Sequence, residues 1–511
     1  MRLRRAEGRT ESLIACGRLY GAPEISGGGS FCCGEFHEVS SFLYATCDTG
    51  VARAMPAGAD RLYPGLILAT TIIASSLAFV DGSVVNVGLP AIRASLGARD
   101  ETLQWVINAY LLPVSSLILL GGAAGDRFGR KRFLMLGVAV FALASLLCAL
   151  ANSPTALIFS RVVQGIGAAI LLPNSLAVLG ETFTGEARGR AVGTWASVAA
   201  VVGAIGPVLG GWLIDMVGWR AIFLINLPLA IAAIALAFLF VPLEEAAEKR
   251  TSLDLWGGVL ATAGLGGLTW GLTVGSGPAG WNREAAIAVW AGGMVLIAFV
   301  GFERARGGRA MMPLELFLSR TFVGLTLLTL FLYGALGGLI VLLPYVLITA
   351  AHYSATAAGA ALLPLPLVMA CASPFTGALA ARIGPRLPLS IGPLLVAGGF
   401  GLLMQMDESG SYWSVIFPAM LLIALGMSLA AAPLTTAVLG SVDAAHQGSA
   451  SGFNSAASRI GGLVATALLG SALAATGPAL MAEVSMAAIA GAIAAIAASL
   501  SAFTLVQGKK A

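Results

Sequence analysis

Two ionisable residues, Asp81 and Arg161, lie within long apolar stretches of the sequence. A carboxylate in a hydrocarbon environment loses its hydration, which favours the neutral, protonated form. Such an acid can take up a proton on one side of a membrane and release it on the other. A buried guanidinium needs a carboxylate, a backbone carbonyl or water as its partner. The sequence therefore predicts a proton-coupling site that contains Asp81 and Arg161.

The expected depth of these two side chains allows them to meet. Each lies about six residues from the expected outer end of its helix, and a rise of about 1.5 Å per residue places both roughly 9 Å deep. Structural alternatives remain, because Asp81 could cap a frayed helix end and Arg161 could be a buried structural cation. Gln164 and Arg459, which also lie in apolar stretches, are candidate gating residues. Arg459 could equally reach the cytoplasmic surface along its own helix.

Residues 122–132 combine glycines, one acid and four bases in a short segment between two apolar stretches. Glycine permits a tight turn, and the acid can pair with a nearby arginine or with helix N-terminal amides. We interpret this segment as a cytoplasmic gating loop that joins helices of opposite halves in one access state and releases them in the other. The alternative is an ordinary solvated basic loop. The candidate residues are Gly122, Asp126, Arg127, Gly129, Arg130 and Lys131.

A third motif places small residues at helical spacing around one proline. Small faces let two helix backbones approach closely, and an interior proline removes a helical hydrogen bond and favours a bend. The alternative is ordinary tight packing in a glycine-rich chain. The residues of this motif are Gly203, Gly206, Pro207, Gly210 and Gly211.

The amino-acid composition indicates the environment that surrounds these residues. The chain has 511 residues, of which 58% are hydrophobic and 11% are charged; soluble domains carry roughly 25% charged residues. A formal net charge of +4 provides no basic face for nucleic acid. The three His and six Cys show no metal-ligand spacing, so we expect neither a metal nor a cofactor. The sequence therefore predicts a polytopic, all-α membrane protein.

Fourteen stretches are apolar and long enough to cross a bilayer, for which a helix needs about 20 residues. The loops on the side of residues 124–132, together with the C-terminal tail, carry sixteen Lys and Arg residues, against four on the opposite side. Because cytoplasmic loops are enriched in these residues, both termini are expected in the cytoplasm. The predicted spans are 64–87, 102–123, 133–151, 155–179, 191–214, 220–241, 255–275, 285–303, 321–348, 356–380, 388–405, 412–435, 451–475 and 480–505.

An internal repeat suggests how the spans are grouped. Residues 122–131 match 377–386, and residues 189–193 match 448–452, in equivalent loops. The second copy has Ala381 where the first has Asp126, so an acid-dependent latch would be asymmetric. Two parallel halves with the substrate site between them are a known transporter architecture. We therefore expect an N-terminal six-helix half at 61–241, inserted helices 7 and 8 at 242–310, and a C-terminal six-helix half at 311–511.

Residues 1–60 are expected to form a separate cytoplasmic tail. They contain four of the six Cys and no apolar segment of the kind found in secretory signals. We interpret them as a disordered tail or as an over-extended reading frame whose true start is Met55. The alternative is an appendage with redox-sensitive thiols.

The motifs together resemble those of the major facilitator superfamily, in particular its fourteen-helix drug:proton antiporter family. The similarity covers the G-x-x-x-D-R-x-G-R-K order at 122–131, the R-x-x-Q-G order from Arg161, the Gly206-Pro207 helix and the segment that follows Asp81. It implies the major facilitator fold and a functional monomer in the cytoplasmic membrane of a bacterium. It also implies export of hydrophobic or amphipathic drugs in exchange for protons.

Other functions fit the sequence less well. A proton-coupled symporter, or an exporter of one specific metabolite, remains the alternative on the same fold. An enzyme is not expected, because the three His fall in the tail and in loops on opposite sides. The phosphate-binding order G-x-x-x-x-G-K-S/T is absent from the sequence, which argues against direct use of ATP. The expected partners are therefore a small-molecule substrate, protons and the lipid bilayer.

Overall fold

The computed structural model describes residues 63–242, 253–277, 279–307, 310, 312–407, 412–443 and 447–507. Over these ranges the chain forms helices joined by turns, without a strand. The predicted tail at 1–60 and its alternatives lie outside the described residues. All structural statements below refer to the unit that begins at Leu62.

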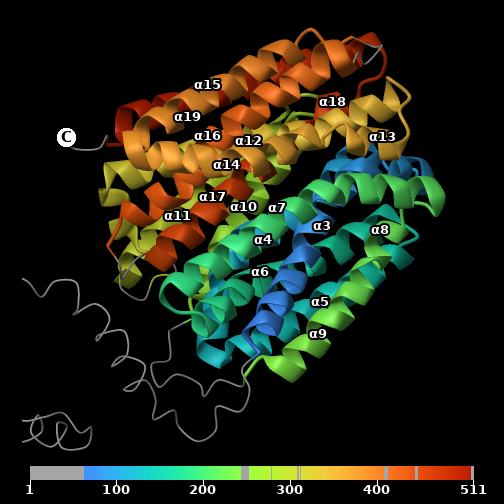
Figure 1. Cartoon of the computed structure of the whole chain (residues 1–511). Coiled ribbons are helices and arrows are strands. Elements are labelled where there is room, and N and C mark those ends of the chain that lie inside the picture. The colour runs from blue at the N-terminus through green and yellow to red at the C-terminus, as the bar shows by residue number, and fades with distance from the viewer. Residues whose placement is uncertain are drawn as a thin grey trace, which may run out of the picture. The chain divides into compact units, whose positions relative to one another are not determined.

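The first group of helices contains α3 to α9 and corresponds to the first six predicted spans (Figure 1). The sixth span is broken, because α8 and α9 are separated at Ile225. The members are α3 (Pro64–Leu96), α4 (Asp100–Phe128), α5 (Arg130–Leu150), α6 (Pro154–Thr182), α7 (Gly185–Met216), α8 (Ala221–Leu224) and α9 (Asn226–Phe240).

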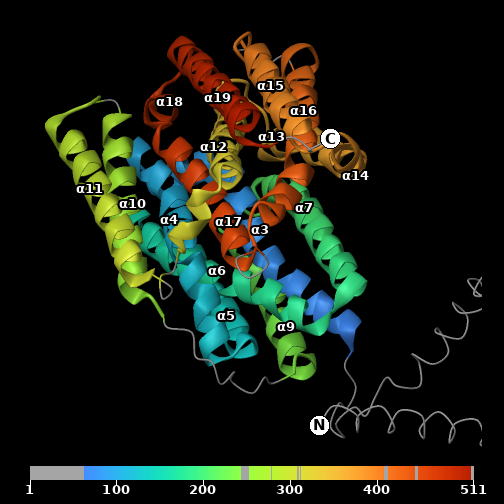
Figure 2. The ribbon, with the colours of Figure 1, turned by 90° about the vertical axis from the view of Figure 1, so that its left-hand side faces the viewer.

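A helix pair and a second group follow. The pair is α10 (Leu255–Gly275) and α11 (Arg283–Arg306), which pack side by side and contact the rest of the bundle through α4 and α17 (Figure 2). The second group contains η3 (Leu314–Leu318), α12 (Arg320–Thr349), α13 (Ala355–Ala360), α14 (Pro364–Ile383), α15 (Arg386–Leu403), the π-helix η4 (Tyr412–Ile416), α16 (Phe417–Gly440), α17 (Gln447–Ala467), α18 (Gly470–Ala474) and α19 (Pro478–Leu505).

Each predicted span coincides with one helix or with a broken pair of helices. Thirteen helices of the described chain are long and apolar enough to cross a membrane. The predicted span 451–475 is not among them, and it falls on α17 and α18. The helix α17 is less apolar because it carries Asn454, Ser458 and Arg459 within 21 residues. The all-α membrane architecture predicted from the sequence is confirmed, with this polar helix as the exception to the hydropathy pattern.

The repeated loop motif produces the same turn in both copies. Gly129 lies between α4 and α5 with φ of 103°, and Gly384 lies between α14 and α15 with φ of 88°. A side chain would be strained at these positive φ values, so glycine is the suitable residue. Gly384 occupies in the second copy the place that Gly129 has in the first. The repeat seen in the sequence therefore has a conformational counterpart.

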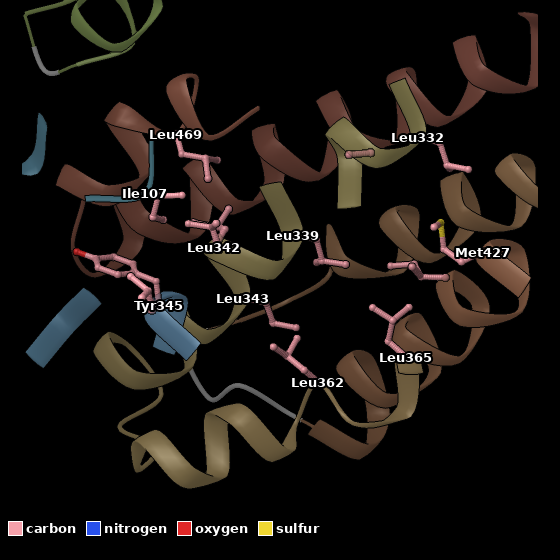
Figure 3. Close-up of a cluster of buried hydrophobic side chains, with 14 of the residues drawn as sticks. Ile107, Leu332, Leu339, Leu342, Leu343, Tyr345, Leu362, Leu365, Met427 and Leu469 are labelled. Atoms are coloured by element: carbon pink, nitrogen blue, oxygen red, sulfur yellow. The ribbon is translucent and has the colours of Figure 1, made fainter. Parts of the chain in front are cut away.

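A buried apolar cluster connects the two groups of helices. Ile107 of α4 lies in the same cluster as Leu339 and Leu342 of α12, Leu362 of the turn between α13 and α14, and Leu469 (Figure 3). Direct helix contacts between the groups include those of α3 with α12 and α13, of α4 with α17 and α18, and of α7 with α13 and α14. The residues predicted to do chemistry lie on these contacting helices or immediately behind them.

Candidate functional site

Asp81 and Arg161 form a buried ion pair between α3 and α6. Their side chains are 0% and 1% exposed, and Arg161 Nη1 donates to Asp81 Oδ2. Gln164, one turn further along α6, donates from Nε2 to Asp81 Oδ1 at 2.8 Å. The sequence predicted equal depth for the two charged residues, and the structure adds their lateral contact. Because both charges are buried, each depends on the other for its stability.

Polar side chains from two further helices complete this network. Gln164 Nε2 also donates to Ser145 Oγ of α5 at 2.8 Å. Asn226, at the start of α9, lies with Nδ2 3.3 Å from Ser145 Oγ and 3.4 Å from Asp81 Oδ1. The side chain of Asn226 is fully buried. Four helices therefore meet at one carboxylate.

Arg161 is held on its remaining sides by α4 and α8. Its Nε donates to the backbone carbonyl of Val106 at 3.0 Å. The guanidinium lies over the ring of Tyr110, 4.4 Å from the centroid, and 5.8 Å from the ring centroid of Phe223. Cation–π contacts of this kind are strongest where water is excluded. The side chain of Arg161 thus has its charge matched and its orientation fixed.

A cavity of about 200 Å³ lies next to this network, between the two groups of helices. One wall comes from α3, α4 and α6, and the opposite wall comes from α12 and α17. The candidate gating residue Arg459 lines it, whereas Gln164 is fully buried behind it. The polar and aromatic lining residues are Asn86, Tyr110, Arg161, Tyr333, Ser458, Arg459 and Thr466.

A larger and mostly apolar crevice of about 980 Å³ lies on another face of α12 and α17. It is bounded by α10, α11 and α19 and includes Phe331. Glycines pack where α12 meets α17, since a Cβ on Gly337 would lie 2.8 Å from Gly462 Cα. Gly337 and Gly462 line the smaller cavity, whereas their neighbours Gly338 and Gly461 line the crevice.

The glycine-rich motif on α7 packs closely, but not at every position. A Cβ on Gly206 would clash with Ser83 of α3, and a Cβ on Gly210 would lie 2.7 Å from Val84. A Cβ on Gly211 would clash with the backbone of Ala355 in α13. The predicted close approach is therefore present at three glycines. Gly203 differs, because nothing lies within 4 Å of its Cβ position.

Pro207 contributes to the same contact through its backbone. A Cβ on Gly359 of α13 would clash with the Pro207 carbonyl. Nearby, Asp215 accepts from Thr356 N at 2.9 Å and from Thr356 Oγ1 at 2.6 Å. These contacts join the two groups of helices at the end of the bundle where α7 ends. We call it the Leu96 end, after the last residue of α3.

A second set of contacts joins the groups at the Leu96 end. Arg93 Nη1 of α3 donates to Tyr345 Oη of α12 at 2.7 Å and to the Leu473 carbonyl at 3.0 Å. Tyr345 Oη donates to the same carbonyl at 2.8 Å. Figure 3 shows the Tyr345 ring at the margin of the buried cluster. The two groups are therefore bonded to each other at this end.

The candidate gating loop makes its polar contacts within the first group of helices. Arg130 pairs with Asp126, with 2.8 Å between Nη2 and Oδ1, and its Nη1 pairs with Glu181 of α6. Lys131 Nζ donates to the carbonyls of Phe238 at 3.0 Å and Val241 at 2.5 Å, which ties α5 to α9.

The remaining residues of this loop have packing roles in this conformation. Arg127 lies over the ring of Phe128, with 5.4 Å from its guanidinium carbon to the ring centroid. A Cβ on Gly122 would contact Pro173 of α6 at 3.4 Å. A latch to the opposite half is not formed among these described contacts, and its switching stays a prediction.

Sequence reasoning missed Glu181 and Ser145. Glu181 lies on the last turn of α6, where an acid resembles any solvated helix end, and Ser145 is an isolated hydroxyl in an apolar span. The signal available for Glu181 was the cluster of bases in 127–132, which requires an acidic partner. No comparable signal marked Ser145.

Comparisons with known proteins identify the family. The family model of the Major Facilitator Superfamily matches residues 71–466 and 325–507. "Multidrug resistance protein Stp" of Mycobacterium tuberculosis is 33% identical over 411 residues, which cover 79% of this chain and 76% of that protein. The "Tetracenomycin C resistance and export protein" of Streptomyces glaucescens is 32% identical over 431 residues, covering 83% of this chain and 78% of that protein.

Solved structures agree on the fold. A structure of an auto-inhibited POT family peptide transporter superposes with a TM-score of 0.64 at 17% identity, covering 86% of this chain and 96% of that chain. At this identity the similarity shows the fold alone. The sequence matches, the fold and the apolar helices agree that this chain is a multi-pass bacterial membrane protein, and it belongs to the major facilitator superfamily.

Proposed function

We propose that this protein is a proton-coupled exporter of hydrophobic or amphipathic drugs and other small molecules. The observation that carries the proposal is the buried Asp81–Arg161 pair beside a cavity between the two groups of helices. The names of the relatives, which include multidrug resistance and antibiotic export, support export as the direction. The partners are then the substrate, protons and the bilayer, and the monomer is the functional unit.

Asp81 acts as the proton carrier in this proposal. When its carboxylate binds a proton, the charge that balances Arg161 disappears, and the network through Gln164 and Asn226 must rearrange. The helix α3 carries Asp81, the cavity residue Asn86 and the cross-group contact of Arg93. A change at Asp81 can therefore reach both the cavity and the contacts at the Leu96 end.

Coupling requires that proton and substrate differ in their affinity for two access states. We propose that the N-terminal half at 61–241 and the C-terminal half at 311–511 rock about the cavity, with the inserted helices at 242–310 outside this movement. The bonds of Asp215 and Arg93 close the Leu96 end in the state described here. With both termini in the cytoplasm, as the distribution of Lys and Arg predicts, this is the external gate.

The loop at 122–132 serves as the gate at the opposite end. The contacts of Arg130 with Asp126 and Glu181 hold α4, α5 and α6 together as one body while the external gate is closed. In the other access state, residues of this loop are proposed to exchange these partners for ones on the opposite half. Exchange of this kind requires only surface ion pairs, which are individually weak and hence easily replaced.

Transport into inverted membrane vesicles tests the proposal. The vesicles are energised with a pH gradient in which the interior is more acidic than the medium. The accumulation of a panel of fluorescent dyes and antibiotics inside the vesicles is measured with and without a protonophore. We expect accumulation that the protonophore abolishes. Accumulation that needs ATP and survives the protonophore would contradict the mechanism. Substrate movement in the same direction as the proton would instead support the symporter.

A further inference from the structure

Arg459 of α17 stands out among the cavity residues because its charge has no partner. Its side chain lines the central cavity opposite α3 and α4. Among the described residues it makes no hydrogen bond and no ion pair that the structure records. Arg161, on the facing wall, differs because its charge is balanced by Asp81. The cavity therefore presents one unbalanced cation.

No nearby acid is placed to supply the missing charge. The lining residues from α3, α4, α6, α12 and α17 include neither Asp nor Glu. Asp81, the acid behind the cavity wall, is 0% exposed, and its carboxylate oxygens are held by Arg161, Gln164 and Asn226. Among the described residues, no acid balances Arg459, which leaves its guanidinium available to an anion that enters the cavity.

We propose that Arg459 binds the anionic group of the transported compound, such as a carboxylate or a phenolate. The inference rests on the proposed export function and names its substrate class. A guanidinium offers a planar pair of donors that matches a carboxylate. The rings of Tyr110 and Tyr333 and the side chains of Leu336 and Ile340 provide apolar surface for the rest of the molecule.

This arrangement separates the two tasks of the transporter. The proton acts on a carboxylate that is hidden behind the cavity, whereas the cargo meets a guanidinium that lines it. A neutral compound of the same shape would occupy the apolar walls but leave Arg459 without an anion. The cavity therefore distinguishes an acid from its neutral derivative by one charge-assisted interaction.

A matched pair of probes tests the proposal on the purified full-length protein in nanodiscs of zwitterionic lipid. Dansylglycine carries a carboxylate, and its methyl ester has the same fluorophore without the charge. We expect the acid to bind more tightly than the ester. Arg459→Gln should weaken binding of the acid by about tenfold to a hundredfold and change binding of the ester by less than about twofold.

Two further variants control for the geometry of the charged group and for the loss of an arginine elsewhere in the chain. Arg459→Lys keeps the positive charge but loses the planar pair of donors, so it should retain part of the preference for the acid. Arg283→Gln removes the same side chain at an exposed position of α11 that does not line the cavity, and it should leave the preference intact. Unchanged ester binding shows that Arg459→Gln is folded.

The outcomes separate this inference from the proposed function. Equal binding of acid and ester, or an equal loss of both in Arg459→Gln, would overturn the role of Arg459 in binding anions. If proton-driven transport of neutral dyes persists in that case, the export function stands and only the substrate class is wrong. If wild-type vesicles accumulate no compound of either kind, the proposed function fails and this inference fails with it.

Discussion

The two walls of the central cavity carry the same side chain in opposite circumstances. Arg161 is 1% exposed and bonded to a carboxylate, an amide oxygen and a backbone carbonyl. Arg459 faces it from α17 without a bond to any described residue. In a medium of low dielectric, a balanced cation belongs to a network, whereas an unbalanced one attracts an anion. From this comparison we propose that one wall serves proton coupling and the other recognises the cargo.

The largest expected effect is a difference in stability between the variants that lack one or the other arginine. Arg161→Ala leaves Asp81 buried without a counter-charge, which should lower the free energy of unfolding by about 3–5 kcal/mol. Arg459→Ala removes no bond and should change it by less than about 1 kcal/mol. Thermal unfolding of the purified variants measures both. Similar losses in the two variants would contradict the comparison.

A second substitution tests whether the destabilisation comes from the uncompensated charge. Asp81→Asn in the Arg161→Ala background removes the remaining buried charge, so it should restore part of the lost thermal stability. Failure of the double variant to recover any stability would mean that packing against Tyr110, and not charge, dominates at Arg161.

The next largest effect is expected from a substitution that disturbs the helix contact at the Leu96 end. Gly211→Ala places a methyl group against the backbone of Ala355, which should destabilise the closed Leu96 end by about 1–3 kcal/mol and reduce transport. Gly203→Ala is the matched control on the same helix, because nothing lies near its Cβ position. Transport assays and thermal unfolding compare the two. Equal transport rates and equal unfolding temperatures in the two variants would show that α7 and α13 need not pack this closely.

Loss of a polar contact at the network should have a similar or smaller effect. Gln164→Leu removes the Nε2 donor to Asp81 and Ser145, and we expect a loss of about 1.5–3 kcal/mol because the acceptor is charged. Ser458→Ala on the opposite wall should change stability by less than about 0.5 kcal/mol. Thermal unfolding again provides the measurement, and a larger loss for Ser458→Ala would reverse the assignment of the walls.

The smallest effect is expected at Tyr345. Tyr345→Phe keeps the ring in its apolar surroundings but removes the hydroxyl that joins Arg93 and the Leu473 carbonyl. We expect a loss of about 1 kcal/mol and a modest change in transport rate. An unchanged transport rate and an unchanged unfolding temperature would indicate that Arg93 alone holds this contact.

The sequence predicted much of the fold because a helix that crosses the hydrocarbon core of a bilayer must be long and apolar. Apolar length located thirteen of the fourteen predicted spans on helices of membrane-spanning length and hydropathy, and the distribution of Lys and Arg predicted an orientation. Only α17 fell below the hydropathy of a typical span, since the residues that line the cavity make it polar. The break between α8 and α9 was not predicted, because the whole segment is apolar.

The candidate site was predictable in part. Depth along a helix follows from residue number, so Asp81 and Arg161 could be placed at one level. Their contact depends on how α3 and α6 are rotated, which a single sequence does not reveal. The difference between Gly203 and Gly211 depends on a neighbouring helix, since only Gly211 meets α13. The isolation of Arg459 is also a property of its surroundings and not of its residue type.

Transport by Asp81→Asn tests the central claim most directly. The substitution keeps the size of the side chain but cannot carry a proton. In vesicles with equal pH on both sides, the variant should still exchange labelled for unlabelled substrate, and it should lose accumulation driven by a pH gradient. Asp443→Asn, at an exposed acid after α16, should keep both activities. Gradient-driven accumulation by Asp81→Asn at the wild-type level would contradict the role of Asp81 as the proton carrier.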